Sequence, residues 1–408
     1  MIIKYVIGHA GTGKSHLLVQ HLNQLDPART LVLAPTHKAL LVLTNRLNND
    51  LYEFSTIHAA LGWRPGINED ATSTHHVDIT HKLDKEFPSG INSIIIDEFS
   101  MMSEEMLFEL TSKIDELTDW DSDHITLTLY GDPYQLPPVK ASPIQTDPST
   151  TTHLTKQYRS KSEDIPALFT KFVSYIEGAN TKDLSIPASE HVEYVTSIKG
   201  FKRGDRALAY TNSMVGQLNQ EIAFSLKFNG YQGTEVQLGS MLETIIVDQY
   251  YTNITKEILL ALYEEGKLIL QNMQINKKFL DLTMHKLATD TDIKFILATN
   301  GLTYAVLEGI GDAYLLRQQI KTAAVDAPQG TSKRSKAWQR YYTIERAFTM
   351  DYPFASTVYK SQGGEWETVW IHKADMLKAI GFTKNYKHYA RMMYVALSRA
   401  TKKVNIYV

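Results

Sequence analysis

One short segment near the start of the chain constrains the fold more than any other. Residues 8–15 read Gly-His-Ala-Gly-Thr-Gly-Lys-Ser, which fits the pattern G-x-x-x-x-G-K-[ST]. An apolar run at residues 2–7 precedes this segment, and a helical pattern at residues 14–25 follows it. A strand, a turn and a helix in this order predict a phosphate-binding loop in an α/β fold.

The residue types of the loop suit the triphosphate of ATP. Gly11 and Gly13 let backbone N–H groups approach phosphate oxygens without interference from a Cβ atom. We expect Lys14 to neutralise the β- and γ-phosphate oxygens and the Ser15 hydroxyl to coordinate Mg²⁺. The predicted contacts to ATP are therefore Gly8, Gly11, Thr12, Gly13, Lys14 and Ser15.

A later apolar run ends in two acidic residues. Residues 94–96 are three isoleucines, and Asp97 and Glu98 follow them directly. In a fold with a phosphate-binding loop, Asp97 would lie at the carboxyl edge of the sheet, where Mg²⁺ binds. Glu98 is then placed to orient or deprotonate the attacking water. The alternative is that the two acids only cap the end of a strand.

The next apolar run, residues 126–130, leads into Gly-Asp-Pro-Tyr-Gln-Leu-Pro-Pro at residues 131–138. A glutamine at this edge of the sheet can hydrogen-bond the γ-phosphate or the attacking water. We therefore predict that Gln135 senses hydrolysis. The alternative is a proline-rich turn without a catalytic role.

Composition excludes several classes of protein. The chain has no cysteine, which rules out disulfides, thiolate zinc sites and thiol catalysis and fits a cytoplasmic protein. No apolar run approaches the roughly 20 residues of a membrane span, so no membrane partner is expected. The net charge of −3 argues against an indiscriminate nucleic-acid coat protein but not against a nucleic-acid motor.

The pattern along the chain predicts parallel α/β cores in both halves, because strands and helices alternate before residue 130 and again after about residue 202. Residues 63–90 interrupt the first half with polar, glycine and proline residues and predict a hairpin. Residues 237–316 predict a β-rich insertion in the second half. Residues 326–336 are polar and basic and predict an exposed linker.

Further segments resemble, in order, the signature motifs of superfamily 1 helicases. They are Ala-Pro-Thr-His-Lys at 34–38, Ser-Thr-Ile-His at 55–58, Gln-Tyr-Arg-Ser at 157–160, Thr-Val-Tyr-Lys-Ser-Gln-Gly at 357–363 and Tyr-Val-Ala-Leu-Ser-Arg-Ala at 394–400. The Gln-Leu-Pro-Pro-Val and Lys-Ser-Gln-Gly forms resemble the B-type branch of RecD-, Pif- and phage Dda-like enzymes. The spacing along nearly the whole chain is most similar to the bacteriophage Dda-like members.

This resemblance implies two RecA-like domains with ATP between them, each carrying a small insertion. The first domain would span residues 1–62 and 91–165, with a pin-like insertion at 63–90. The second would span residues 166–240 and 345–408, with an SH3-like β insertion at 241–344. A phage origin would place the protein in the host cytoplasm. Only seven residues precede Gly8 in this sequence, so the resemblance does not say which residues contact adenine.

The resemblance also assigns roles to residues far from the loop. Arg159 and Arg399 would be arginine fingers that reach the γ-phosphate, and Gly363 would lie at the nucleotide. The rate of ATP hydrolysis would therefore depend on how the two domains are positioned. For either arginine a surface ion pair is the alternative.

A track for single-stranded DNA follows from the same motifs. Hydroxyls, single cations and aromatic faces at the loops after the strands suit contact with phosphates and bases. The predicted DNA-contacting residues are Thr36, His37, Lys38, His58, Phe87, Pro138, Thr357, Tyr359, Lys360 and Ser361. Phe87 is the candidate wedge of the pin, with packing on its own domain as the alternative. Tyr359 stands where the family commonly has histidine, and the two histidines could instead be packing residues.

The function implied is an ATP-dependent, Mg²⁺-dependent DNA helicase. It would act as a monomer, move 5′→3′ on single-stranded DNA and unwind forked duplex DNA in replication, recombination or repair. Single-strand-binding or replisome proteins are candidate partners. The alternatives are a translocase that displaces proteins without unwinding and an RNA-directed or ATP-switched binding module.

Overall fold

The computed structural model describes residues 1–47, 51–65, 79–82, 90–117, 125–138, 141–156, 158, 164–178, 185–239, 244–271, 275, 277–381 and 385–408. The described strands form two six-stranded sheets, one five-stranded sheet and one two-stranded pair. The chain divides into two compact units. Unit 1 contains residues 1–193, 361–369 and 376–405, and unit 2 contains residues 194–360, 370–375 and 406–408.

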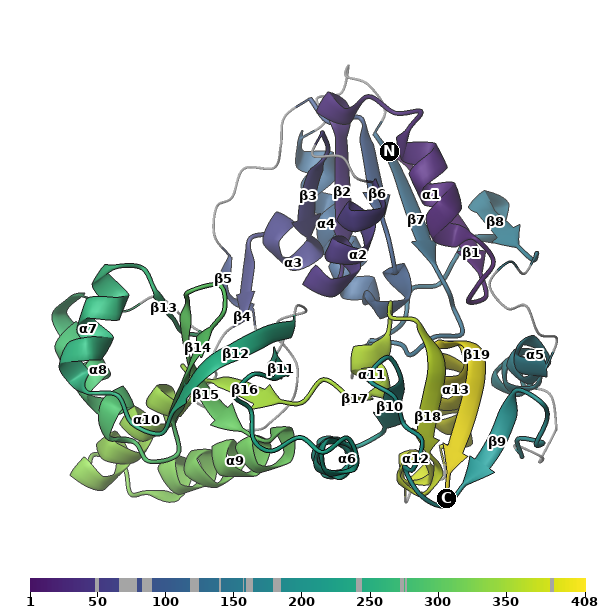
Figure 1. Ribbon diagram of the computed structural model, residues 1–408. Helices are drawn as coiled ribbons and strands as arrows, with labels where there is room; N and C mark the ends of the chain where they lie inside the picture. The colour runs from purple at the N-terminus through teal and green to yellow at the C-terminus, as the bar shows by residue number, and fades with distance from the viewer. Residues whose placement is uncertain are drawn as a thin grey trace. The chain divides into compact units, whose positions relative to one another are not determined.

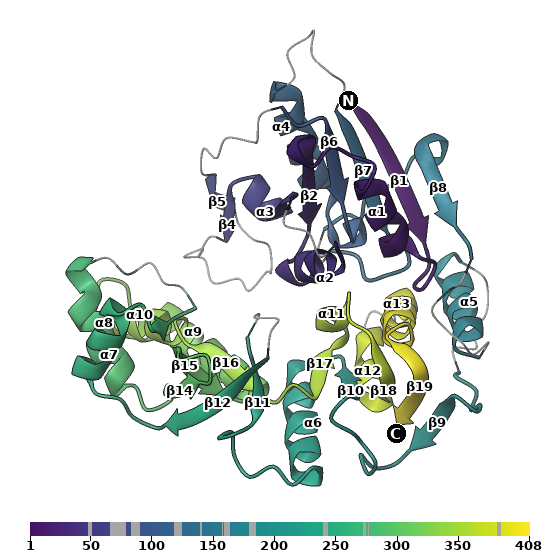
Figure 2. The same cartoon turned by 45° about the horizontal axis from the view of Figure 1, so that its top comes forward.

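Unit 1 is built on a six-stranded sheet with the order β3-β2-β6-β7-β1-β8 (Figures 1 and 2). Its strands are β1 (Ile2–Gly8), β2 (Thr30–Ala34), β3 (Glu53–Thr56), β6 (Ser93–Ile96), β7 (Thr126–Gly131) and β8 (Thr151–Leu154). All neighbouring strands in this sheet are parallel. The parallel α/β core predicted for the first half of the chain is therefore confirmed.

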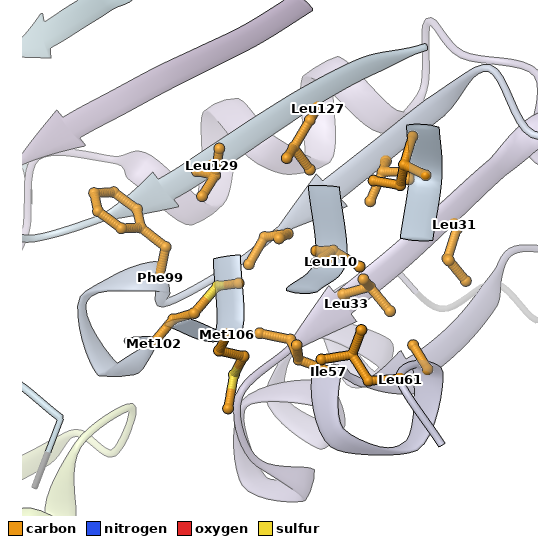
Figure 3. Packing of buried hydrophobic residues seen from close by; sticks show 14 of the residues in the cluster. Leu31, Leu33, Ile57, Leu61, Phe99, Met102, Met106, Leu110, Leu127 and Leu129 are labelled. Atoms are coloured by element: carbon orange, nitrogen blue, oxygen red, sulfur yellow. The ribbon is translucent and has the colours of Figure 1, made fainter. Parts of the chain in front are cut away.

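Helices cover both faces of this sheet, which explains why its strands are continuous apolar runs. They are α1 (Lys14–Leu22), α2 (His37–Leu47), α3 (Ile57–Ala60) and α4 (Glu104–Leu117), with short 3₁₀ turns at Pro27–Arg29 and Phe99–Met101. Leu18 and Leu22 of α1 pack on one face with Ile95. On the other face, Leu110 of α4 packs with Leu129 in a larger apolar cluster (Figure 3).

Unit 1 also contains elements outside this sheet. Strands β4 (Trp63–Pro65) and β5 (Ile79–Lys82) pair antiparallel within the predicted hairpin region. Helix α5 (Asp164–Ile176) packs against α13 (Tyr386–Leu397). Two 3₁₀ turns lie at Pro148–Thr150 and Lys378–Ile380. Helix α13 carries the segment at 394–400 into unit 1, and this places it in the same unit as the phosphate-binding loop.

A five-stranded sheet has the order β17-β10-β18-β19-β9. Its strands are β9 (Val192–Val195), β10 (Arg206–Ala209), β17 (Ala355–Thr357), β18 (Trp366–His372) and β19 (Ala400–Tyr407). Strands β10 and β17, both in unit 2, are parallel. Helices α6 (Asn212–Ser225), α11 (Val358–Ser361) and α12 (Lys373–Leu377) follow strands β10, β17 and β18 along the chain.

The second six-stranded sheet lies in unit 2 and has the order β13-β15-β14-β12-β11-β16. Its strands are β11 (Glu235–Leu238), β12 (Thr244–Tyr251), β13 (Leu268–Ile269), β14 (Lys294–Ala298), β15 (Thr303–Glu308) and β16 (Phe348–Asp351). Four helices belong to the same part of the chain (Figure 2): α7 (Lys256–Glu264), α8 (Leu280–Thr289), α9 (Ile310–Asp326) and α10 (Ser332–Ile344). A 3₁₀ turn at Lys277–Phe279 precedes α8.

The region predicted as β-rich, residues 237–316, contains strands β12 to β15 and the end of β11, together with helices α7 and α8 and the start of α9. One expectation nearby is wrong in part. Of the linker predicted at residues 326–336, residues 327–331 connect α9 to α10, but residues 332–336 are the first part of α10, whose N-cap is Thr331. The Arg334 guanidinium donates hydrogen bonds at 3.0 Å to the carbonyls of Val325 and Ala327, at the end of α9. Arg334 therefore satisfies carbonyls at a helix end and is not exposed linker charge.

Within the described ranges, no helix has both the length and the apolar character that crossing a bilayer requires.

Candidate nucleotide site

The loop between β1 and α1 has the conformation that its glycines predict. Gly11 and Gly13 have φ angles of 83° and 85°, a region that L side chains rarely adopt, and Gly13 is the N-cap of α1. A Cβ atom on Gly8 would lie 2.5 Å from the Thr12 hydroxyl oxygen and 2.8 Å from the Leu154 carbonyl oxygen. Gly8 is therefore required by space, and Gly13 by backbone conformation.

The Lys14 side chain folds back over this loop. Its ammonium group donates hydrogen bonds to the carbonyl oxygens of Gly8 at 2.7 Å and His9 at 2.8 Å. It also lies 4.0 Å from Oδ2 of Asp132, and the lysine side chain is only 11% exposed. The Thr12 hydroxyl donates to the same His9 carbonyl at 2.8 Å, so it helps to shape the loop.

The two acids after β6 occupy unusual environments. Asp97 is buried, and burial together with the neighbouring Glu98 raises the pKa of its carboxyl group to about 7. Its Oδ1 accepts a hydrogen bond from the Glu98 backbone N–H at 2.9 Å. Glu98 has a φ of 53°, and its buried Oε2 has no hydrogen-bond partner. Strain and an unpaired acceptor at one residue are typical of a functional position.

A cavity of about 310 Å³ in unit 1 collects most of the predicted nucleotide residues. It is lined by Gly11, Gly13, Lys14, Ser15, Asp97, Glu98, Gln135, Gly363 and Arg399, among others. These residues come from sequence segments that are almost four hundred positions apart.

The oxygen donors of the cavity fit Mg²⁺ that is shared with phosphate groups. Ser15 and Asp97 supply a hydroxyl and a carboxylate, the hard ligands that Mg²⁺ prefers. Among the described residues, no group of three or more His, Cys, Asp and Glu side chains could hold a metal ion. Mg²⁺ binding through one carboxylate, one hydroxyl and substrate phosphates needs no such group.

Gln135 is fixed in the cavity wall by contacts from two other segments. Its side chain is buried, and its Oε1 accepts a hydrogen bond from Nε2 of Gln362 at 3.3 Å. Its carbonyl oxygen accepts a hydrogen bond from the Arg391 guanidinium at 2.8 Å, and the same group donates to the Pro133 carbonyl at 2.6 Å. This geometry favours a positioned side chain over an unconstrained proline-rich turn.

Arg399 lines the cavity, and only 3% of it is exposed, so it is not a surface ion pair. Its guanidinium donates to the Ser398 hydroxyl at 2.8 Å, to the Val395 carbonyl at 3.2 Å and to the Gly364 carbonyl at 3.2 Å. These partners are neutral oxygens. The positive charge of Arg399 is therefore held at the wall of the cavity without a carboxylate among these contacts.

Two further residues contribute to the site, and the sequence interpretation did not single them out. The Tyr158 backbone N–H donates to the Gly11 carbonyl at 2.8 Å, while its ring is 65% exposed and lines the cavity. The same ring lines a neighbouring hollow of about 680 Å³. The Tyr394 hydroxyl accepts a hydrogen bond from the Ala10 N–H at 2.9 Å and donates to Asp132. The sequence signal for Tyr158 was its position beside Arg159 in the segment Gln-Tyr-Arg-Ser, which resembles a helicase motif.

The predicted DNA residues of unit 1 are placed differently from the loops expected. The Thr36 hydroxyl accepts a hydrogen bond from the Ala39 N–H at 3.2 Å and so caps α2, which begins at His37. His37 and Lys38 thus lie in the first turn of a helix. His58 lies half-buried in α3, and burial lowers its pKa below the usual range. Pro138 is half-buried.

The remaining DNA candidates follow β17. Thr357 is buried, and its hydroxyl accepts a hydrogen bond from the Lys360 N–H at 3.3 Å, while the Lys360 side chain is exposed. Tyr359 is half-buried, and burial together with Tyr210 raises the pKa of its hydroxyl to about 12. Ser361, in unit 1, is fully buried, so a phosphate contact by its hydroxyl requires this segment to open.

Some predicted positions lie outside the described residues. They are Phe87, Arg159 and the side chains of His37 and Lys38. Their roles stay predictions.

Two segments of the chain match known protein families. Residues 2–141 match the family model of an AAA domain, and residues 352–407 match the UvrD-like helicase C-terminal domain. An uncharacterized protein of Acanthamoeba polyphaga mimivirus is 21% identical and is matched over 100% of this chain and 95% of its own length.

Two solved structures have a similar fold. Pif1 helicase from Candida albicans is 17% identical, with a TM-score of 0.52 over 100% of this chain and 90% of that chain. Bacteroides Pif1 bound to ssDNA is 16% identical, with a TM-score of 0.50 over 100% of this chain and 89% of that chain. The N-terminal part of the chain thus resembles an AAA domain, the C-terminal part resembles a UvrD-like helicase C-terminal domain, and the whole chain has the fold of the Pif1 helicases.

Proposed function

We propose that the protein is an ATP-dependent DNA helicase that moves 5′→3′ along single-stranded DNA and unwinds duplex DNA. The observation that carries the proposal is the cavity in which Lys14, Asp97, Glu98 and Gln135 meet Arg399. A binding module without turnover needs the loop and the lysine only. The additional acid, amide and guanidinium groups are those that phosphoryl transfer to water requires.

Each group has a distinct task in hydrolysis. Lys14 leaves its carbonyl partners and binds the β- and γ-phosphate oxygens, and Ser15 and Asp97 are the residues that would hold Mg²⁺. Bound Mg²⁺ neutralises charge on the phosphates. Glu98, whose Oε2 has no hydrogen-bond partner among the described residues, accepts a proton from the attacking water. Gln135 orients that water or the γ-phosphate.

Arg399 stabilises the charge that develops on the transferred phosphoryl group. Its present partners are a hydroxyl and two carbonyl oxygens, which hold a guanidinium less strongly than a phosphate does. A bound phosphate can therefore replace these partners and bind the Arg399 guanidinium. Arg159 is proposed as a second finger from its motif.

The exposed ring of Tyr158 is proposed to stack on the nucleotide base. The ring lines both the phosphate cavity and the larger hollow beside it, so a base attached to phosphates in the first would extend along it. Stacking does not distinguish among bases, so we expect hydrolysis of several nucleoside triphosphates.

The DNA-binding role is supported by the motifs and by the fold shared with helicases. Thr36, His58 and Pro138 on unit 1, and Thr357, Tyr359 and Lys360 on unit 2, are proposed to contact phosphates and bases of the strand. His37, Lys38, Ser361 and the wedge Phe87 belong to the same proposal. We propose a monomer whose partners are forked DNA and single-strand-binding or replisome proteins.

Two assays test this function. ATP hydrolysis is measured with single-stranded DNA, with single-stranded RNA and without nucleic acid, using Glu98→Gln as the control that retains nucleotide binding. We expect stimulation by DNA and a loss of about 10²- to 10⁴-fold in kcat for the variant, the usual contribution of a general base. A rate unaffected by DNA would contradict the motor, and stimulation by RNA alone would redirect it.

Unwinding of forks with one single-stranded tail tests the direction. Forks with a 5′ tail should open and forks with a 3′ tail should not. Phe87→Ala should abolish opening while DNA-stimulated hydrolysis persists. An enzyme that hydrolyses ATP on DNA and displaces bound protein, but opens neither fork, is a translocase instead.

A further inference from the structure

Asp132 is a fully buried carboxylate behind the phosphate-binding loop that the reaction above does not use. Its Oδ1 accepts a hydrogen bond from the Tyr134 backbone N–H at 3.1 Å. Its Oδ2 accepts the hydroxyl of Tyr394 and lies 4.0 Å from Nζ of Lys14. A buried carboxylate is costly unless a cation and hydrogen-bond donors compensate it, and these three groups provide that compensation.

The position of Lys14 makes Asp132 a competitor of nucleotide phosphate. The ammonium group is held by the carbonyls of Gly8 and His9 and faces Asp132 across 4.0 Å. Phosphate oxygens bound in the loop would attract the same ammonium in another direction. Binding of nucleotide therefore requires Lys14 to exchange a buried carboxylate for a phosphate, and release of nucleotide reverses the exchange.

Tyr394 controls the strength of this competition. Its hydroxyl donates into Oδ2, the oxygen that faces Lys14, and thereby lowers the negative charge available to the lysine. The same hydroxyl accepts the Ala10 N–H at 2.9 Å, which ties the loop to α13. Because α13 leads directly into Arg399, a change in the contact between Tyr394 and Ala10 would also reach the proposed arginine finger, Arg399.

We propose that Asp132 is the resting counter-ion of Lys14, and that Tyr394 is a positioning residue that sets how strongly Asp132 competes with nucleotide phosphate. The inference rests on the nucleotide site proposed above and adds a means of product release to it. After hydrolysis, Asp132 recaptures the ammonium and weakens the hold on the diphosphate. No covalent change is involved.

The test measures binding of a fluorescent ADP analogue with Mg²⁺ to the full chain without DNA. Asp132→Asn should bind about tenfold more tightly and release more slowly, a factor that corresponds to about 1.4 kcal/mol of removed attraction. Tyr394→Phe should bind several-fold more weakly, because Asp132 then attracts Lys14 more strongly. In the Asp132→Asn background the effect of Tyr394→Phe should disappear.

Tyr134→Phe is the matched control. It removes a hydroxyl from the same aromatic cluster, but that hydroxyl bonds Glu177 and not Asp132. Its affinity should equal that of the wild type. Circular dichroism and thermal unfolding check that each variant folds.

Three results would overturn the inference: unchanged or weaker binding by Asp132→Asn, unchanged binding by Tyr394→Phe, or a loss from Tyr394→Phe that persists in full in the Asp132→Asn background. The last would mean that Tyr394 acts through its contact with Ala10 and not through Asp132. If one single variant fails to fold, the other decides. A wild-type chain that binds no nucleotide would refute the proposed function itself, whereas normal wild-type binding with unaltered variants refutes only the role of Asp132.

Discussion

Gly131, the last residue of β7, has no room for even one methyl group. A Cβ atom there would lie 2.6 Å from Cδ1 and 2.8 Å from Cε1 of Phe99. Phe99 is 2% exposed and is part of the cluster in Figure 3. Its ring also meets the Tyr5 ring edge-on, at a centroid distance of 5.8 Å. Because the ring is buried in this packed cluster, it has little room to move away. Gly131→Ala therefore overpacks the core next to Asp132.

The expected cost of Gly131→Ala is about 1–3 kcal/mol of unfolding free energy, the usual range for overpacking. Urea unfolding measures it, with and without Phe99→Leu. The smaller leucine should remove most of the added cost, so the two changes should couple favourably. Gly90→Ala is the control. Gly90 has a φ of 76°, and no atom lies within 4 Å of an added methyl group, so the loss of unfolding free energy in this variant comes from backbone strain. Phe99→Leu should therefore not reduce that loss.

A Gly131→Ala variant as stable as the wild type would refute the reasoning. A double variant whose loss equals the sum of the single losses would also refute it, because the methyl group would then not meet the Phe99 ring.

Three more outcomes follow from the contacts. Gly8→Ala should lose nucleotide binding in an equilibrium titration while the chain remains folded, since its methyl would meet the Leu154 carbonyl at 2.8 Å. Asp375→Ala should lower the unfolding free energy by about 2–4 kcal/mol in urea, because it leaves the backbone N–H groups of Tyr210 and Thr211, both 2.8 Å from Oδ2, without their acceptor. Burial raises the pKa of Asp351 to about 6, so the folded state binds this proton more tightly than the unfolded state. Its contribution to stability should fall as pH rises from about 4 to 6, by roughly 2–3 kcal/mol, and Asp351→Asn should lack that decline when unfolding is followed at each pH.

Local pattern predicted the first parallel core well. The apolar runs at residues 2–7 and 126–130 lie in β1 and β7, and the helical pattern at 14–25 begins with α1. These elements are buried on known faces, so hydrophobic period and length determine them. The nucleotide-binding residues up to Gln135 could be predicted as well, because each of them lies at or after the end of one of the strands of this sheet.

Local pattern failed at residues 326–336 because polar composition concealed a helix. Thr331 accepts the Arg334 N–H at 3.3 Å and starts α10, and Arg334 in turn bonds the end of α9. Ile344, far along α10, is fully buried and anchors the helix to the core of unit 2. A capping threonine was visible in the sequence, but the tertiary anchor was not.

Spacing could not reveal the partners of Asp132 either. Tyr394 lies 262 positions from Asp132 and 384 from Ala10, and no periodicity links residues at such distances. The motifs indicated that Arg399 belongs to the nucleotide site. They did not indicate that a tyrosine one turn earlier contacts the loop.

The strand that leads into the phosphate-binding loop, β1, is synthesised well before the strands with which it pairs. β1 is made before the other strands of its sheet, yet its two neighbours in the sheet are β7 and β8, and Ile2 pairs beside Thr126. At about 5–20 residues per second, translation exposes β1 for on the order of ten seconds before its first partner exists. Such long-range parallel pairing slows folding, and an unpaired apolar strand invites association with other chains. Nascent chains arrested before residue 125 should therefore be the form of this protein that most needs a chaperone.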